Sequence, residues 1–231
     1  RQRQMCIRDS IDGARETGVT SVGVLWGFGS KFEFIESGAK YIIDKVEDVE
    51  AVALGLYERC ENVQGIFSGN VISVHQDDVI LSNDKPATRE CVDHPGGVGI
   101  ICLNENDEVL LVRQFRYPYK EMIYEIPAGK LEKDEDPYDA ALRELHEECG
   151  AVCEKLTPLG EIYPTPGYTN EIIRLYAAEN PTFTEQELDD DEFLQASTMK
   201  FSTLCAKVMS GEIKDAKTII AVMKLKELRN K

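Results

Sequence analysis

Positively charged residues are scarce in this sequence of 231 residues. The chain has 26 lysines and arginines against 42 aspartates and glutamates, which gives a formal net charge of −16. So large an acidic excess argues against nucleic acid or an anionic membrane as a partner, because both are polyanions. No apolar run approaches the roughly 20 residues that a membrane span requires, and the N-terminus has no signal-peptide core. We therefore expect a cytoplasmic protein with no membrane partner.

Close cysteine pairs are also missing. The seven cysteines include no CxxC pair, and their number is odd. Without a secretion signal, this usage is typical of reduced thiols in a cytosolic protein. The apolar content of 42% is enough for a proper core, and the length allows one large domain or two small ones.

The most informative stretch is residues 129–151, which reads GKLEKDEDPYDAALRELHEECGA. Asp136 is suited to cap the start of a helix, and Pro137 suits the first helical position, where its missing N–H costs nothing. Gly150 can adopt the left-handed conformation that ends a helix. The stretch therefore predicts one well-delimited helix.

Two faces of this helix differ in character. The apolar face consists of Tyr138, Ala141, Leu142, Leu145 and Cys149. Glu144, Glu147 and Glu148 share another arc of roughly 100°. Like charges at this spacing repel, and Arg143 is placed to offset Glu147 only. The arrangement indicates either a solvated acidic face or a site for a cation.

The spacing of the fixed residues favours the cation. Gly129, Glu135 and the run Arg143-Glu144-Leu145-His146-Glu147-Glu148-Cys149-Gly150 match every fixed position in the signature of the Nudix hydrolases, which this stretch therefore resembles. Ala151 departs from the larger aliphatic residue that the family prefers there. The resemblance implies an α/β fold, an α/β/α sandwich with a mixed sheet, over residues 62–231.

The resemblance also implies roles for motif residues. Glu144 and Glu148 are the expected main metal ligands, with Glu147 and the carbonyl of Ala128 completing the set. Arg143 and Glu135 are expected to brace the loop and the helix. Mg²⁺ is the favoured ion because it pairs one or two carboxylates with substrate phosphates, and Mn²⁺ is an alternative. Such ions promote hydrolysis of a pyrophosphate.

A Pro-Gly loop points to the substrate. Residues 163–171 read YPTPGYTNE, and Pro166 lies sixteen residues after Gly150. That spacing resembles the ADP-ribose pyrophosphatases of the family, and three further stretches, 112–118, 125–132 and 215–218, agree. The resemblance implies hydrolysis of ADP-ribose to AMP and ribose 5-phosphate. Two alternatives stay open: another nucleoside diphosphate sugar as substrate, or a nucleotide-sugar-binding regulator with an inactive site.

Several residues outside the helix are candidates for binding and catalysis. The candidates for substrate binding are Arg113, Arg116, Glu125, Arg89, Phe67, Pro166 and Gly167. The two β-strand arginines offer guanidinium groups to a diphosphate, and an aromatic ring such as Phe67 can stack on a base. The resemblance implies a loop glutamate that readies the attacking water. Glu192 aligns best, and Glu187 remains an alternative.

The N-terminal part has a different character. Residues 1–10 have no apolar periodicity, and we expect them to be a non-native junction. Residues 11–60 predict helix, strand, helix, strand and helix, the last over 46–60. The runs DGARETGVTSVGVLWGFGS and ESGAKYIIDKVEDV resemble the C-terminal end of phosphoglycolate-phosphatase-like haloacid dehalogenase proteins. This resemblance implies a small, truncated parallel α/β (Rossmann-like) fragment that is catalytically incomplete.

The remaining elements follow from alternation and turn residues. Strands are expected at 66–68, 71–75, 78–81, 88–93, 97–103, 108–115, 156–162, 172–177 and 193–200. Helices are expected at 202–209 and from Asp215 to the C-terminus. The ADP-ribose pyrophosphatase resemblance further implies a homodimer in which the N-terminal strands, residues 66–81, lie at the interface.

Overall fold

The computed structural model describes residues 2–188 and 193–230, with side chains from Ile7 onward. The chain divides into two compact units. The first comprises residues 1–66 and 75–90, and the second comprises residues 67–74 and 91–231. Among the described helices, none has the length and apolar character to cross a membrane.

The first unit begins with alternating helices and short strands. They are α1 (Gln2–Thr17), β1 (Val22–Val24), α2 (Lys31–Ser37), β2 (Tyr41–Ile43) and α3 (Asp48–Ala53). β1 and β2 pair in parallel, so the predicted order of elements is confirmed. Ile11, Phe34, Tyr41 and Ile43 are buried apolar side chains of these elements.

α1 begins at Gln2 and so includes most of the stretch 1–10, and the interpretation of that stretch as a non-native junction stays a prediction. One expectation for this unit was wrong in extent. The helix expected over 46–60 is only the short α3, because Gly55 adopts a left-handed conformation with φ of 68°. A strand, β3, then begins at Arg59.

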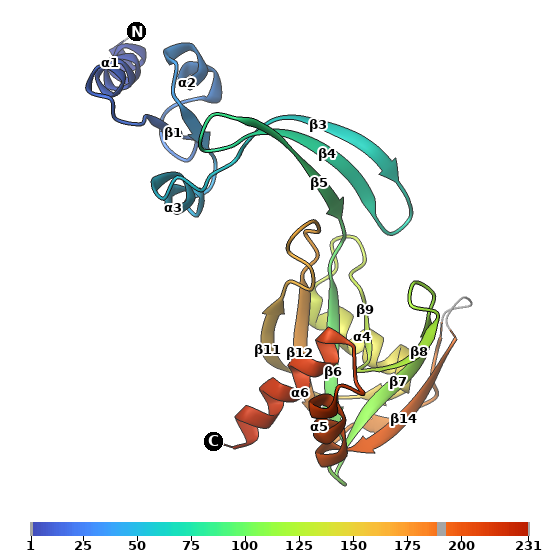
Figure 1. Ribbon diagram of the computed structural model, residues 1–231. Helices are drawn as coiled ribbons and strands as arrows, with labels where there is room; N and C mark the ends of the chain where they lie inside the picture. Colours follow the sequence, from blue (N-terminus) through green and yellow to red (C-terminus); the bar gives the residue numbers. More distant parts are fainter. Residues whose placement is uncertain (1, 189–192, 231) are drawn as a thin grey trace. The chain divides into compact units, whose positions relative to one another are not determined.

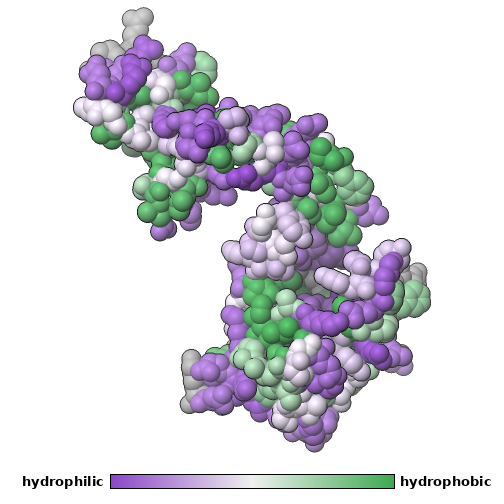
Figure 2. Space-filling view, viewed as in Figure 1, coloured by the Kyte–Doolittle hydropathy of each residue, from purple (hydrophilic) through white to green (hydrophobic). Residues whose placement is uncertain are grey.

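A three-stranded sheet follows, and most of it belongs to the first unit. It contains β3 (Arg59–Ser68), β4 (Ser73–Ile80) and β5 (Pro86–Asp93) in the order β3-β4-β5. β3 is longer than the predicted strand at 66–68. Figure 2 shows hydrophobic side chains near the end of the β3–β4 hairpin, where Ile66, Phe67 and Val71 are exposed.

The second unit is built around a seven-stranded mixed sheet. Its strands are β6 (Gly97–Leu103), β7 (Glu108–Arg116), β8 (Glu121–Glu125), β9 (Ala128–Lys130), β11 (Thr157–Ile162), β12 (Ile173–Glu179) and β14 (Leu194–Lys200). The main order is β11-β12-β6-β7-β14, while β8 pairs with β7 and β9 with β6. β12 runs parallel to β6, and the other pairs are antiparallel. A separate small pair joins β10 (Ala151–Val152) to β13 (Thr182–Phe183).

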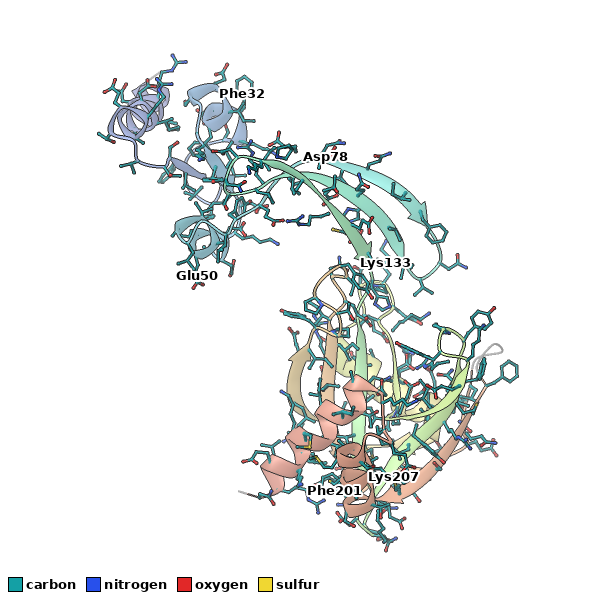
Figure 3. The ribbon with its side chains drawn as sticks, in the orientation of Figure 1. Phe32, Glu50, Asp78, Lys133, Phe201 and Lys207 are labelled. Atoms are coloured by element: carbon teal, nitrogen blue, oxygen red, sulfur yellow. The ribbon has the colours of Figure 1, made fainter. Side chains whose placement is uncertain are left out.

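Helices cover both faces of this sheet (Figure 1). Val98, Ile100 and Leu110 face α4 (Pro137–Cys149), packing in one core with Ala141 and Leu145. The other face packs against α5 (Phe201–Ser210) and α6 (Ala216–Arg229). Phe201, labelled in Figure 3, is a buried member of that second core. The predicted arrangement of a mixed sheet between helices is confirmed.

The motif helix α4 has the predicted ends. The side chain of Asp136 accepts a hydrogen bond from the backbone N–H of Tyr138, and Pro137 occupies the first turn. Gly150 ends the helix with φ of 61°. A Cβ at Gly150 would also lie 2.5 Å from the carbonyl oxygen of Thr184, so both conformation and space require glycine.

Candidate active site

Two carboxylates of α4 are buried beside a backbone strand. Glu144 is 7% exposed and Glu148 is 3% exposed. The carboxylate of Glu144 lies so close to Gly129 of β9 that a Cβ there would overlap it. The motif glycine therefore allows a carboxylate to lie directly against the backbone.

β9 is held on both sides. The backbone N–H of Ala128 donates a 2.8 Å hydrogen bond to Oε2 of Glu148. Residues Ala128–Lys130 pair in register with Gly99, Val98 and Gly97 of β6. A Cβ at Gly97 would lie 2.6 Å from the carbonyl oxygen of Gly129, so this approach also requires glycine. The backbone of Ala128 thus lies next to the Glu148 carboxylate. The role of the Ala128 carbonyl as a metal ligand stays a prediction.

Arg143 joins the loop before α4 to its acidic face. Its Nε and Nη2 donate to both oxygens of Glu135, at 2.8 and 3.0 Å. Its Nη1 donates to Glu144 at 2.9 Å and to Glu147 at 2.8 Å. The expectation that Arg143 offsets Glu147 only was wrong, because Nη1 of Arg143 also reaches Glu144. The expected contact between Arg143 and Glu135 is present.

These contacts fix the charges of the brace. The hydrogen bond to Glu135 raises the pKa of Arg143 above its usual value, against burial, and Glu144 and Glu147 add to the increase. The same hydrogen bond lowers the pKa of Glu135. The brace is therefore a carboxylate–guanidinium pair at neutral pH.

The donor set suits a divalent cation. Glu144, Glu147 and Glu148 place three carboxylates on one helix face, two of them buried. Arg143 brings one positive charge to Glu144 and Glu147 and also binds Glu135. Buried carboxylates in excess of nearby positive charge are expensive unless a cation compensates them. Hard oxygen donors of this kind fit Mg²⁺ or Mn²⁺.

A second charged cluster lies where β7, β8 and α6 meet. Glu125 is 2% exposed and accepts from Nη2 of Arg116 at 2.7 Å and from Nζ of Lys217. Lys217 also donates to Asp215, which caps α6 by accepting from the N–H of Thr218 at 2.9 Å. We name Arg116, Glu125, Asp215, Lys217 and Thr218 the β8–α6 cluster.

This cluster fixes the strand that leads into the motif. The hydroxyl of Thr218 accepts a 2.8 Å hydrogen bond from the N–H of Ile126, two residues before Ala128. Burial acts to raise the pKa of Glu125, but the hydrogen bond from Arg116 and the charge of Lys217 outweigh it and lower that pKa. Glu125 is therefore a buried, ionised carboxylate.

The cluster was only partly foreseen. The Asp215 cap is confirmed, and residues 215–218 carried a family resemblance. Nothing in local spacing linked Lys217 to Glu125, which lies 92 residues earlier.

The structure separates the predicted arginines. Arg113 and Arg116 lie on β7 at positions of opposite parity, so their side chains leave opposite faces of the strand. The guanidinium of Arg113 lies 5.3 Å from the ring centre of Tyr124. Arg116 instead pairs with Glu125, and its pKa is raised by that hydrogen bond, with a smaller contribution from Glu148. Arg89 lies in the first unit and pairs with Glu58 there.

The other predicted binding residues lie at the surface. Phe67 is 57% exposed, and Pro166 and Gly167 are also exposed. Phe67 lies on β3, whereas Pro166 and Gly167 lie in a loop that is fixed to the end of β5, since the N–H of Val92 donates to the carbonyl of Tyr168 at 2.7 Å. The substrate roles of these three residues remain predictions.

A segment carrying acidic residues runs along the end of α4. The N–H of Thr184 donates to the carbonyl of Gly150 at 2.8 Å, and the N–H of Glu187 donates to the carbonyl of Glu147 at 3.1 Å. The described chain thus brings Glu187 beside the acidic face. The other predicted base, Glu192, lies outside the described residues.

Together, the fold and the site define a class: α/β/α sandwiches in which a helix on one face of the sheet carries a cluster of carboxylates. The model of the NUDIX domain family matches residues 93–221, and the chain belongs to that family. The resemblance of residues 11–60 to haloacid dehalogenase proteins gains no support from these comparisons.

Two relatives are similar over most of their own length. An ADP-ribose pyrophosphatase of Bacillus subtilis (strain 168) is 42% identical over 74% of this chain and 95% of its own. A methanol dehydrogenase activator of Bacillus methanolicus is 41% identical over 73% of this chain and 92% of its own. Among solved structures, an ADP compounds hydrolase superposes with a TM-score of 0.67 at 20% identity, covering 75% of this chain and 94% of that one. That last likeness concerns the fold alone.

Proposed function

We propose that this protein hydrolyses the pyrophosphate bond of ADP-ribose in a Mg²⁺-dependent reaction that releases AMP and ribose 5-phosphate. The observation that carries the proposal is the pair of buried carboxylates, Glu144 and Glu148, held against β9. The 42% identity to a pyrophosphatase named for ADP-ribose supports the substrate.

In this proposal Glu144, Glu147, Glu148 and the carbonyl of Ala128 hold the metal. When bound, Mg²⁺ or Mn²⁺ would neutralise phosphate charge and lower the pKa of an attacking water. Arg143 keeps Glu144 and Glu147 oriented through its shared Nη1, while Glu135 fixes the guanidinium plane. Their part is to position oxygen donors before the substrate arrives.

The proton from the attacking water goes to a loop carboxylate. We assign this role to Glu192, with Glu187 as the alternative. Support comes from the segment 184–187, which lies alongside the end of α4 and places the backbone of Glu187 against that of Glu147.

Paired substitutions test this assignment. Glu192→Gln should lower kcat by roughly 10² to 10⁴ while ADP-ribose affinity, measured by calorimetry, stays near the wild-type value. Glu187→Gln is the matched control, with the same chemical change five residues away. If Glu187→Gln shows the large loss and Glu192→Gln does not, the roles are reversed and the assignment is wrong.

Substrate recognition is assigned to Arg113, Arg116, Glu125, Arg89, Phe67, Pro166 and Gly167. Arg116 is the best supported of the arginines, since it lies near Glu148 and its pKa is influenced by that carboxylate. Glu125 acts by holding Arg116, because both of its oxygens already accept from Arg116 or Lys217.

A substrate panel distinguishes the alternatives. We expect ADP-ribose to give the highest kcat/KM among nucleoside diphosphate sugars with Mg²⁺. If a different sugar nucleotide is cleaved faster, the assignment of ADP-ribose as substrate is wrong, while the assignment of pyrophosphate hydrolysis stands.

The similarity to a methanol dehydrogenase activator favours a regulator as the second candidate. A regulator would bind a nucleotide sugar without turnover.

We further propose a cytoplasmic homodimer whose contacts include residues 66–81. Exposed apolar side chains on this part of the β3–β5 sheet support it, namely Ile66, Phe67 and Val71. Size-exclusion chromatography with light scattering tests the assembly, and an active monomer would refute it. For residues 11–60 we keep the haloacid dehalogenase resemblance as a proposal, with no catalytic role.

A further inference from the structure

Two thiols meet in the core beneath the motif helix. Cys102 lies on β6 and is 0% exposed, and Cys153 follows β10 and is 7% exposed. Their Sγ atoms are 3.9 Å apart, although the residues are 51 positions apart in sequence. We propose that Cys102 and Cys153 are a site of oxidative modification, which a peroxide converts into a reversible disulfide.

Cys153 is reachable from solvent through a cavity of the second unit. The cavity has a volume of about 870 Å³, and Cys153 is among its lining residues. Its walls also come from the end of β12, at Ala178 and Glu179, and from the end of α6, at Leu228 and Arg229. Hydrogen peroxide or a small alkyl hydroperoxide is small enough to enter, while Cys102 lies fully buried behind.

The two thiols also differ in acidity. The hydrogen bond between them lowers the pKa of Cys153, against its burial, and the same contact together with burial raises the pKa of Cys102. The thiolate is the reacting form of cysteine. Cys153 is thus the residue that attacks the peroxide, and Cys102 is the residue that then reacts with the oxidised Cys153.

The reaction balances in two steps. The Cys153 thiolate attacks one peroxide oxygen, the O–O bond breaks, and a sulfenic acid forms while hydroxide, or an alkoxide, leaves and takes a proton. The Cys102 thiol then displaces water from the sulfenic acid and forms the S–S bond. Each sulfur loses one electron, and the peroxide gains two. A dithiol restores both thiols by exchange.

The disulfide would act on the motif helix. An S–S bond of about 2.05 Å requires the sulfur atoms to approach by roughly 2 Å. Cys153 lies five residues after Glu148, and β6 also pairs with β9 at its other end. This consequence rests on the proposed function: oxidation should lower ADP-ribose turnover several-fold, because small displacements of positioning groups slow catalysis.

Peptide mapping of the full chain tests the bond itself, whatever the reaction catalysed. Protein is treated with hydrogen peroxide, denatured with N-ethylmaleimide and digested with trypsin. The relevant peptides, 90–113 and 144–155, contain two cysteines each, so fragmentation between the cysteines must assign the link. We expect peptides joined through Cys102 and Cys153, two hydrogens lighter than the reduced pair, and separated by dithiothreitol.

Exposed Cys60 is the internal reference for oxidation. The proposal is overturned if Cys60 oxidises while Cys102 and Cys153 stay reduced, or if either thiol pairs elsewhere. Cys102→Ala should leave a Cys153 sulfenic acid that dimedone traps, whereas Cys153→Ala should leave Cys102 reduced.

Turnover is a separate readout. Oxidised wild type should lose activity and regain it with dithiothreitol, while Cys102→Ala should show no dithiothreitol-reversible loss. The partly buried Cys205, on α5, supplies the matched control Cys205→Ala, which should behave as wild type. If oxidised protein contains the Cys102–Cys153 disulfide but hydrolyses ADP-ribose as fast as reduced protein, the proposed effect of the disulfide on the motif helix is wrong. Absence of any ADP-ribose hydrolysis in reduced protein would instead reject the proposed function and leave the disulfide standing.

Discussion

At the scale of single residues, the site depends on two glycines as much as on its carboxylates. Gly129 leaves room for the Glu144 carboxylate against β9, and Gly97 leaves room for the Gly129 carbonyl. Arg143 then distributes its hydrogen bonds among Glu135, Glu144 and Glu147. The glycines of the site therefore have a steric role: because they lack side chains, the carboxylates and the guanidinium group can lie close together.

Substitution of Gly129 by alanine should separate activity from stability. The new Cβ meets the far end of the Glu144 side chain, which can rotate away, so the melting temperature should change little. Turnover should fall by roughly 10- to 100-fold, because the carboxylate leaves its position. The matched control is Gly13→Ala, since a Cβ there meets nothing within 4 Å. Turnover of Gly129→Ala equal to wild type would show that the close approach has no catalytic role.

At the scale of elements, the β8–α6 cluster joins the neighbouring strands β7 and β8 to α6, which lies far along the chain. Arg116 of β7 and Lys217 of α6 share the buried carboxylate of Glu125 on β8, and Thr218 fixes the backbone at Ile126. The turn from β8 into β9 is therefore positioned from the opposite helix layer. This explains how α6 contributes to a site built on α4.

Glu125→Gln should destabilise the protein at neutral pH by roughly 3 kcal/mol, because Arg116 and Lys217 lose their charged partner. The pKa of Glu125 is lowered by folding, so its contribution is full above the unfolded pKa and is lost as pH falls through the folded value. The stability difference between variant and wild type should thus shrink in acid. Urea unfolding followed by circular dichroism from pH 7 to pH 3 measures it. A difference that is independent of pH would contradict an ionised Glu125.

Local signals account for what could be predicted among the elements. The ends of α4 followed from Asp136, Pro137 and Gly150, because caps depend on neighbouring residues. β8 was not expected, and the contact of Arg143 with Glu144 was misjudged. The first depends on how the chain folds back onto β7 and the second on the direction that the Arg143 side chain takes in the folded protein, and spacing along one helix contains neither. The Cys102–Cys153 contact was missed for the same reason.

At the scale of the whole molecule, the described site residues of the motif all belong to the second unit. The match to the family model, residues 93–221, also lies within it. The first unit has buried apolar side chains that include Ile11, Phe34, Tyr41 and Ile43, and its parallel strand pair is a separate sheet. Catalysis and the N-terminal elements are therefore expected to be separable.

Removal of residues 1–57 should leave kcat for ADP-ribose unchanged. The cut spares β3 and the pair between Glu58 and Arg89. Steady-state kinetics of the shortened and full chains, with circular dichroism to check folding, provide the comparison. A folded, shortened protein with strongly reduced kcat would assign the N-terminal elements a part in the reaction.

The most direct measurement is the release of AMP from ADP-ribose by the purified full chain, followed by chromatography with and without Mg²⁺. We predict equal amounts of AMP and ribose 5-phosphate with Mg²⁺, none in the presence of a chelator, and a rate lower by about 10² or more in Glu148→Gln. A metal-replete protein that binds ADP-ribose but does not cleave it would contradict the central claim.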